Sequence, residues 1–520
     1  MPIDTEKMIP EDAPVVMLNA VLERLDYREL AATYSRSGRI EYSPKHLFKV
    51  VIYAYFRGIY SSREIERACR ENIHFMYLLE DNTAPDHNTI DRFRRKHLSQ
   101  AAEGLLVQLV EYLTEIGEIS FERSAVFIDG TKIEANANRY SFVWKTATEK
   151  HREKMWVRIR KELPGMLEQV ELPCPEKPDP GFLKEAASVL EDRKERERIV
   201  FVSGKGSRKT KLQRILEQIR DWIGKEEQYA EYLEIIGEGR NSFSKTDHDA
   251  TFMHMKEDHM RNGQLKPGYN VNVASVSEYA VGSYISSDRT DVNTLIPFLK
   301  KLMKQNYPVG RTVVDSGYES EENYRFCETC EQLSLFVKPA DHEVRKTKKY
   351  RTDISRRENM QYDEKLDQYI CAAGKALVPT EVKHVKTASG YVTEKTVYAC
   401  RECAGCPKKQ ACIRSRSGKP LEERNKRIEV SKYFAEQRKQ MEKKICSKEG
   451  ILLRVNRSIQ SEGVFAFVKE DMAFRRFLTR GKQNVMTEWT LLMIAYDLKK
   501  LYFRTKNRRL GTHLFLPDTA

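Results

Sequence analysis

The sequence predicts an α/β protein in which a mixed sheet is flanked by helices, with an all-helical N-terminal domain and two insertions. Three observations predict this arrangement. Apolar residues recur every three or four positions over residues 15–115, and short apolar runs that end in Asp129 and Asp315 are typical of buried strands. Long charged segments with helical periodicity separate those strands. At 520 residues with 40% hydrophobic content, the chain is long enough for about three domains with real cores.

Residues 1–118 are expected to form a helical domain that binds DNA. Within them, SSREIERACREN and, after a break, HNTIDRFRRKHL predict two short helices joined by a turn. This pattern is compatible with a helix-turn-helix whose second helix enters the major groove. We expect Arg92, Arg94 and Arg95 on that helix to contact DNA. The alternative is a helical domain that shows the pattern by chance.

The sheet is expected from residues 119–141 and 246–340. A strand ends at Asp129, and two β-rich runs, GYNVNVASV and YAVGSYISS, predict a hairpin. A helix, the strand TVVDSG, another helix and the strand LSLFVKP follow. Strand, hairpin, helix, strand, helix, strand is the order of an RNase H-like mixed sheet. Residues 142–245 interrupt this order and predict an inserted helical arm.

A second insertion, residues 341–430, contains a cluster of cysteines. Four of the ten cysteines of the chain fall in YACRECAGCPKKQAC: Cys400, Cys403, Cys406 and Cys412. Such a turn-rich segment can direct several thiolates at one tetrahedral Zn²⁺ ion. The second half of the usual paired CxxC pattern is missing, so unligated thiols are the alternative. The six scattered cysteines do not suggest a disulfide scaffold.

Three acids have distinctive settings: Asp129, Asp315 and Glu462. A carboxylate at the C-terminal end of a strand points into the crevice where α/β sheets bind ligands, although a lone strand-end Asp is more often a turn former. Glu462 lies in residues 431–520, whose helices are expected to complete the core. Acids that converge through the fold can hold a pair of divalent ions, which predicts phosphodiester chemistry. The alternative for Glu462 is a surface acid, and Glu470 is its obvious decoy.

The net charge of +14 is concentrated at one end of the chain. From residue 413 onward there are 25 Lys and Arg against 12 Asp and Glu. A basic field around a carboxylate site suits a polyanionic substrate, because the acids require metal and the bases bind phosphate. A solvated basic surface is the alternative.

The chain resembles the DDE transposases of bacterial insertion sequences. The resemblance rests on DGTKIEANANR, TDHDATFMH leading to KPGYNVNVA, VVDSGYESEENY, the cysteine segment and RSIQSEGVFAFVKEDMAFRRF. It implies a DNA transposase that binds terminal inverted repeats, cleaves the transposon ends and transfers the 3′-OH ends into target DNA. It also implies that Asp129, Asp315 and Glu462 hold two Mg²⁺ ions, for which Mn²⁺ can substitute. The expected partners are double-stranded DNA and a second copy of the chain in a synaptic homodimer.

The family has a Tyr, Arg, Glu, Lys signature that is only partly present. Glu462 and Lys469 are seven residues apart, so both project from one helix face. The Arg does not align, because its expected position is Ser458, whereas Arg457 is one residue off and Arg454 is a turn earlier. We expect further DNA contacts from these basic residues: Lys132, Lys338, Arg457, Lys469, Arg475 and Arg476.

Two other classes of protein stay open. One is an RNase H-like nuclease that cuts DNA without joining it, and the other is an inactive DNA-binding relative. The second would be expected to have lost one of the three acids, and all three are present. The N-terminus has no secretory pattern, and no run approaches roughly 20 apolar residues, so we expect a cytoplasmic protein, associated with the nucleoid when bound to DNA.

Overall fold

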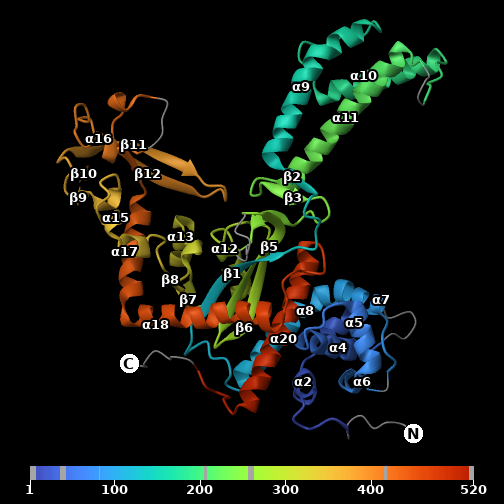
Figure 1. Cartoon of the computed structure of the whole chain (residues 1–520), viewed down its shortest axis with the longest axis vertical. Coiled ribbons are helices and arrows are strands. Elements are labelled where there is room, and N and C mark those ends of the chain that lie inside the picture. The colour runs from blue at the N-terminus through green and yellow to red at the C-terminus, as the bar shows by residue number, and fades with distance from the viewer. Residues whose placement is uncertain are drawn as a thin grey trace. The chain divides into compact units, whose positions relative to one another are not determined.

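The computed structural model describes the chain from residue 8 to residue 513 with five gaps. The described residues are 8–34, 42–80, 82–203, 208–255, 263–414 and 419–513. They form two compact units (Figure 1), one from the described parts of 1–136 and 269–520, the other from those of 137–254 and 263–268. Helices and a mixed sheet confirm the predicted α/β class. The finer division into five parts stays a prediction.

The N-terminal region of the first unit is helical, as its apolar periodicity predicts. Its helices are α2 (Pro14–Leu22), α3 (Arg28–Ala32), α4 (Pro44–Phe56), α5 (Ser62–Glu71), α6 (Ile73–Leu79), α7 (His87–Arg92), the π-helical η1 (Phe93–Leu98) and α8 (Ser99–Glu115). Every residue of α4 from Leu47 to Phe56 is buried. Helix α4 is therefore the centre of this region, since only an enclosed helix buries all its faces.

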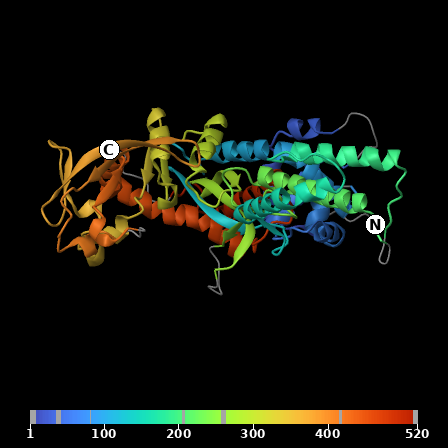
Figure 2. The same cartoon turned by 90° about the horizontal axis from the view of Figure 1, so that it is seen from above.

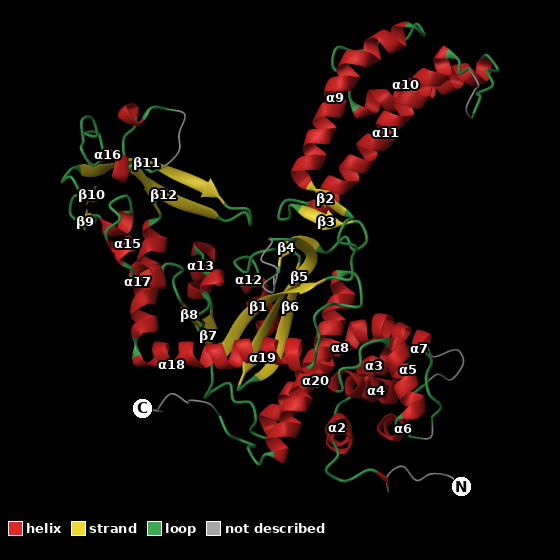
Figure 3. Ribbon diagram, in the orientation of Figure 1, coloured by secondary structure: helices red, strands yellow, loops and turns green. Residues whose placement is uncertain are grey.

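A mixed sheet forms the core of the first unit (Figure 3). Its strand order is β6 (Tyr279–Ser286), β5 (Leu265–Val276), β1 (Val126–Glu134), β7 (Arg311–Val314) and β8 (Ser334–Val337). Strands β5 and β6 are antiparallel, whereas β1, β7 and β8 run parallel. The first strand thus lies in the middle, with the hairpin on one side and the two later strands on the other. This is the predicted RNase H-like sheet.

Among the helices that pack against this sheet or its edges are α12 (Leu295–Lys304), α13 (Glu321–Thr329) and α20 (Lys482–Lys506). Helix α20 contacts β6, α4 and α8, and every residue from Trp489 to Leu498 is buried. The C-terminal helices therefore complete the core. None of the helices in the described ranges is both long and apolar enough to cross a membrane.

The insertion before the C-terminal helices is a small β domain (Figures 1 and 2). Its antiparallel sheet has the order β13 (Arg427–Val430), β12 (Val392–Ala399), β11 (Ala376–Lys386), β10 (Gln368–Ile370) and β9 (Gln361–Asp363). Two short helices, α14 (His342–Arg345) and α15 (Lys348–Arg351), precede it. Its core consists mainly of Leu377, Tyr398, Cys400 and Val430.

The second unit is a helical arm. Helices α9 (Lys145–Glu168), α10 (Pro180–Arg196) and α11 (Lys211–Ile236) pack through a core that includes Ile159, Leu163, Leu216, Ile219 and Trp222. Strands β2 (Phe142–Trp144) and β3 (Ser242–Ser244) pair where the arm begins and ends, and β4 (Thr251–His254) pairs with residues 265–268. The charged helical pattern of residues 142–245 thus forms its own packed unit.

The helix that carries Glu462 begins at a sharp corner (Figure 1). Ser447 ends α17 (Lys432–Cys446) and caps α18 (Lys448–Arg457), where its hydroxyl accepts a hydrogen bond from the Gly450 amide at 3.1 Å. A Cβ atom on Gly450 would overlap the carbonyl oxygen of Lys444 and lie 2.6 Å from the Cα of Ile445. Only glycine permits this close approach of the two helices.

We expect Gly450→Ala to destabilise the protein by about 1–3 kcal/mol, because the added methyl group must push backbone atoms apart. Urea unfolding followed by circular dichroism measures the effect. Gly224→Ala is the matched control, because Gly224 lies in α11 with no atom within 4 Å of the added Cβ. Alanine is the better helix former there, by up to about 1 kcal/mol. Equal stability losses in both variants would contradict the close approach.

Candidate active site

Asp129 follows a run of buried apolar residues within β1, which continues to Glu134, so the prediction that the strand ends at Asp129 is wrong. Its side chain is only 8% exposed, and its Oδ1 accepts a hydrogen bond from the Gly130 amide at 2.9 Å. Val126, Phe127 and Ile128 fix this position because their side chains belong to the core. A carboxylate in such an enclosed place requires positive partners, metal or hydrogen-bond donors.

Asp315 follows β7 directly and lies beside Asp129. In the parallel pair β1–β7, Ile128 is opposite Val314, so Asp129 and Asp315 are the next residues along two neighbouring strands. The side chain of Asp315 also caps the short turn η2 (Ser316–Tyr318), where its Oδ1 accepts from the Gly317 amide at 2.8 Å. Asp315 therefore both forms a turn and lies at the end of its strand.

Glu462 approaches this edge through Arg457. One guanidinium nitrogen of Arg457 lies 3.6 Å from Asp129 Oδ1, and the other lies 3.5 Å from Glu462 Oε1. The arginine is 21% exposed, whereas the Glu462 side chain is 61% exposed. Two of the three predicted acids are therefore joined by one shared cation.

A π-helical turn explains why the expected arginine position is displaced. Residues Ser458–Glu462 form the π-helical turn η5, which continues into α19 (Gly463–Ala466). In a π turn the bonded residues are five apart, so Arg457 takes the place expected for residue 458. The Ser458 hydroxyl instead donates to the Val455 carbonyl at 2.9 Å. Of the three candidate positions, it is therefore Arg457 that forms ion pairs with Asp129 and Glu462.

Lys469 lies over the same strand as Asp129. Its Nζ donates to Thr131 Oγ1 at 2.9 Å, and Thr131 is two residues after Asp129 in β1. A second π-helical turn, η6 (Phe467–Asp471), contains the lysine. The predicted pairing of Glu462 and Lys469 on one side of this helix agrees with these contacts.

The structure adds an acid that the sequence reasoning missed. Asp291, in the loop between β6 and α12, accepts a hydrogen bond from Asn270 Nδ2 at 2.7 Å. Burial raises the pKa of Tyr318 well above its ordinary value, and the charges of Asp291, Asp129 and Asp315 raise this pKa further. Three carboxylates therefore surround one tyrosine. The segment SSDRTDVN carries no signal that distinguishes Asp291 from an ordinary loop acid.

The N-terminal arginines are placed differently from the helix-turn-helix prediction. Helix α6 lies between the two predicted helices, and the second of them continues from α7 into η1. Arg94 is 6% exposed, and its guanidinium donates to the Tyr60 carbonyl at 2.8 Å and to Ser62 Oγ at 2.5 Å. Arg92 and Arg95 are exposed, and Arg95 pairs with Asp91 at 3.1 Å. Arg94 is thus engaged inside the domain.

The other predicted DNA contacts have varied surroundings. Lys132 is half-buried in β1, and Lys338, just after β8, lies 3.7 Å from Glu343. Arg475 pairs with Glu470 at 3.1 Å, and Arg476 donates to the Ala135 carbonyl at 3.2 Å. The aromatic residues on either side of these two arginines, Phe474 and Phe477, are core residues, so they are not available for base stacking.

A fifth cysteine joins the predicted cluster. Cys371, Cys400, Cys403, Cys406 and Cys412 line a cavity of about 20 Å³ together with four lysines, Lys375, Lys408, Lys409 and Lys426. Burial raises the pKa of Cys400 to about 11. Within the described ranges, however, no three His, Cys, Asp or Glu side chains are grouped closely enough to hold a metal ion. Cys371 lies 29 residues before Cys400, so no sequence motif links it to the other four cysteines.

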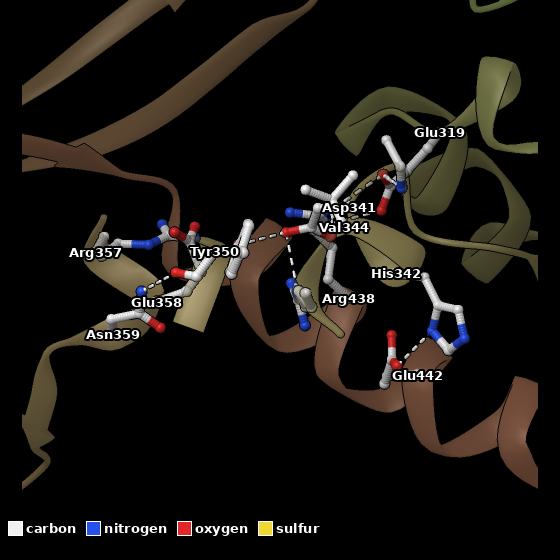
Figure 4. A network of polar contacts seen from close by, with 12 residues as sticks. Glu319, Asp341, His342, Val344, Tyr350, Arg357, Glu358, Asn359, Arg438 and Glu442 are labelled. Atoms are coloured by element: carbon white, nitrogen blue, oxygen red, sulfur yellow. Dashed lines mark hydrogen bonds and ion pairs between the residues drawn. The ribbon is translucent and has the colours of Figure 1, made fainter. Parts of the chain in front are cut away.

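A network of ion pairs connects α17 with the loop after Asp315 (Figure 4). Arg438 donates to Glu319 Oε1 at 2.7 Å and to Asp341 Oδ1 at 2.5 Å. His342 forms a 2.6 Å contact with Glu442 one turn further along α17. Glu319 is four residues after Asp315, so the same helix that leads to Glu462 is fastened to the segment that carries the second acid.

The fold belongs to the mixed α/β class and has the strand order predicted for an RNase H-like sheet. Residues 370–502 match the family model "Transposase DDE domain", and residues 3–96 match "Transposase domain (DUF772)". These matches support the resemblance to insertion-sequence DDE transposases. No curated protein and no solved structure matches the chain significantly.

We expect Arg94→Met to lower the free energy of unfolding by about 1.5–3 kcal/mol, because it removes hydrogen bonds from a buried charged donor. Chemical denaturation of the purified protein measures this change. Arg92→Met removes the same charge from an exposed position two residues away and should stay within about 0.5 kcal/mol of the wild type. If the two variants were equally stable, the structural role of Arg94 would be refuted.

Proposed function

We propose that this protein binds the terminal inverted repeats of an insertion sequence, cleaves the ends and transfers the 3′-OH ends into target DNA. The observation that supports this most is the side-by-side placement of Asp129 and Asp315 just after the last paired residues of β1 and β7, with Arg457 linking Asp129 to Glu462. The transposase family matches at both ends of the chain agree with it. An RNase H-like nuclease without strand transfer is the second candidate.

The donor set of this site fits hard divalent cations. Asp129, Asp315 and Glu462 offer only carboxylate oxygens, which suit two Mg²⁺ ions and would also accept Mn²⁺. When bound, such ions generate a nucleophile near neutral pH and stabilise the charge of an in-line phosphoryl transfer. Glu462, with its 61% exposed side chain on a π-helical turn, is the acid with most freedom to close on the other two.

The basic residues have separate tasks in this proposal. Arg457 balances the charge of Asp129 and Glu462 in the free protein, and its planar fork can turn to a DNA phosphate when cations take over that role. Lys469, held above β1 by Thr131, binds a phosphate as a point charge. In the cleavage step, water attacks phosphorus, the P–O3′ bond breaks, and the leaving oxygen takes a proton to become the 3′-OH end.

The proposed DNA contacts follow the surface of the first unit. They are Arg92, Arg95, Lys132, Lys338, Arg457, Lys469, Arg475 and Arg476; Arg94 is left out because its guanidinium is engaged inside the domain. Two transposon ends require two sites, so we propose a homodimer in the synaptic complex. Binding to DNA would also place the protein on the nucleoid.

A structural Zn²⁺ ion in the insertion is part of the proposal. The thiols of Cys400, Cys403, Cys406 and Cys412 fit this ion by donor chemistry, and Cys371 is a fifth candidate ligand. Because burial raises the pKa of Cys400, metal binding would release protons. Elemental analysis of the purified protein decides between Zn²⁺ and the alternative of unligated thiols.

We expect Asp129→Asn, Asp315→Asn and Glu462→Gln each to abolish Mg²⁺-dependent cleavage and strand transfer, because each removes a charged ligand. The assay uses supercoiled DNA with paired inverted repeats and separates cleaved from joined products. Glu470→Gln, on the same helix but paired with Arg475, should retain activity. Retained cleavage in any of the three acid variants would refute the assignment. Cleavage without joining in the wild type would favour the nuclease.

Lys469→Gln should weaken binding to transposon ends and lower the slope of log K against log salt by about 1, because one phosphate contact is lost. Fluorescence anisotropy at several salt concentrations measures the slope. Lys365→Gln makes the same charge change at an exposed position in the β domain and should leave the slope unchanged. An unchanged slope in Lys469→Gln would remove this residue from the DNA contacts.

A further inference from the structure

Asp291 lies close to the backbone next to both Asp129 and Asp315. A Cβ atom on Gly130 would be 2.8 Å from Asp291 Oδ1, and a Cβ atom on Gly317 would be 3.3 Å from Asp291 Oδ2. These glycines are the residues whose amides donate to Asp129 and Asp315, respectively. The Asp291 carboxylate therefore packs against the backbone next to both Asp129 and Asp315, and it occupies space that any larger residue at 130 would require.

The oxygens of Asp291 and Asp315 are near each other. The Cβ position of Gly317 is 3.0 Å from Asp315 Oδ1 and 3.3 Å from Asp291 Oδ2, so these two oxygens are at most about 6 Å apart. Carboxylates at such a separation repel each other unless a cation or a set of donors lies close by. The repulsion makes this edge of the sheet a place that favours a divalent cation.

A buried asparagine supplies an independent observation. Asn270 in β5 is fully buried, and its Nδ2 donates to Asp291 Oδ1 at 2.7 Å. Its own Oδ1 is buried and has no hydrogen-bond partner among the described residues. An unpaired buried acceptor is costly, and a cation-bound water is a donor that would satisfy it. Two residues along β5, Asn272 accepts from the Tyr318 hydroxyl at 2.6 Å and from Thr294 at 2.8 Å.

We propose that Asp291 is a positioning residue of the candidate active site. It acts by packing against the backbone at Gly130 and Gly317, next to Asp129 and Asp315, and through its negative charge, which strengthens cation binding by Asp129 and Asp315. This inference rests on the proposed function, because it assumes that Asp129 and Asp315 bind divalent cations. Asn270 holds the Asp291 carboxylate in its orientation and presents the free acceptor beside it.

The test measures Mn²⁺ binding to the full-length protein by calorimetry, in the absence of DNA. Asp291→Asn keeps the size of the side chain and removes its charge. We expect its Mn²⁺ affinity to fall roughly 10- to 100-fold, as is typical when a partner of metal ligands is lost. The metal concentration for half-maximal cleavage should rise by a similar factor, saturating Mn²⁺ should restore activity, and Asp291→Glu should recover part of the affinity.

Asp288→Asn is the matched control. Asp288 lies in the same loop, and its carboxylate accepts hydrogen bonds from Asn293 and Thr290 instead. Its loss should leave Mn²⁺ affinity unchanged. The proposal is overturned if Asp291→Asn binds Mn²⁺ like the wild type, or if its affinity falls only in proportion to lost thermal stability. If the wild type binds Mn²⁺ through Asp129 and Asp315 and Asp291→Asn weakens this binding, but the wild type never cleaves DNA, the proposed function fails while the role of Asp291 stands.

Discussion

The parallel pairing of β1 with β7 is the constraint on which the candidate site depends. It places Ile128 opposite Val314 and so brings Asp129 and Asp315 to the same edge of the sheet, although 186 residues separate them in the chain. Apolar burial fixes the register, because both strands are buried along this pair and a slip of one residue would exchange the side chains packed on the two faces of the sheet. The same pairing creates a cost, since like charges so close together require a counter-charge.

Arg457 supplies a positive charge next to Asp129, and the geometry of its helix explains how it reaches this position. The corner at Ser447 and the glycine at 450 set the start of the helix, and the π-helical turn η5 rotates Arg457 and Glu462 onto one side. A regular α-helix would place Ser458 there instead. An irregularity of the backbone thus positions residues of the candidate site, and π turns are frequent at functional sites.

Ion pairs connect the helix that follows the β domain of residues 361–430 to the candidate active site. Arg438 on α17 bonds Glu319 and Asp341, so the helix that leaves the β domain is tied to the loop after Asp315 (Figure 4). Partly buried ion pairs of this kind hold a fixed geometry well, because breaking one leaves an uncompensated charge. Such a connection fits a site whose third acid comes from a separate part of the chain.

The sequence by itself determined the α/β class, the order of the central strands, the helical arm and the three acids. These follow from local periodicity and from apolar runs that end in Asp129 and Asp315. The tertiary structure alone decided that Arg457 rather than residue 458 meets the acids, that Arg94 is buried, and that Asp291 and Cys371 join distant clusters. Each of these depends on a π turn or on contacts between distant segments, which leave no periodic pattern in the chain.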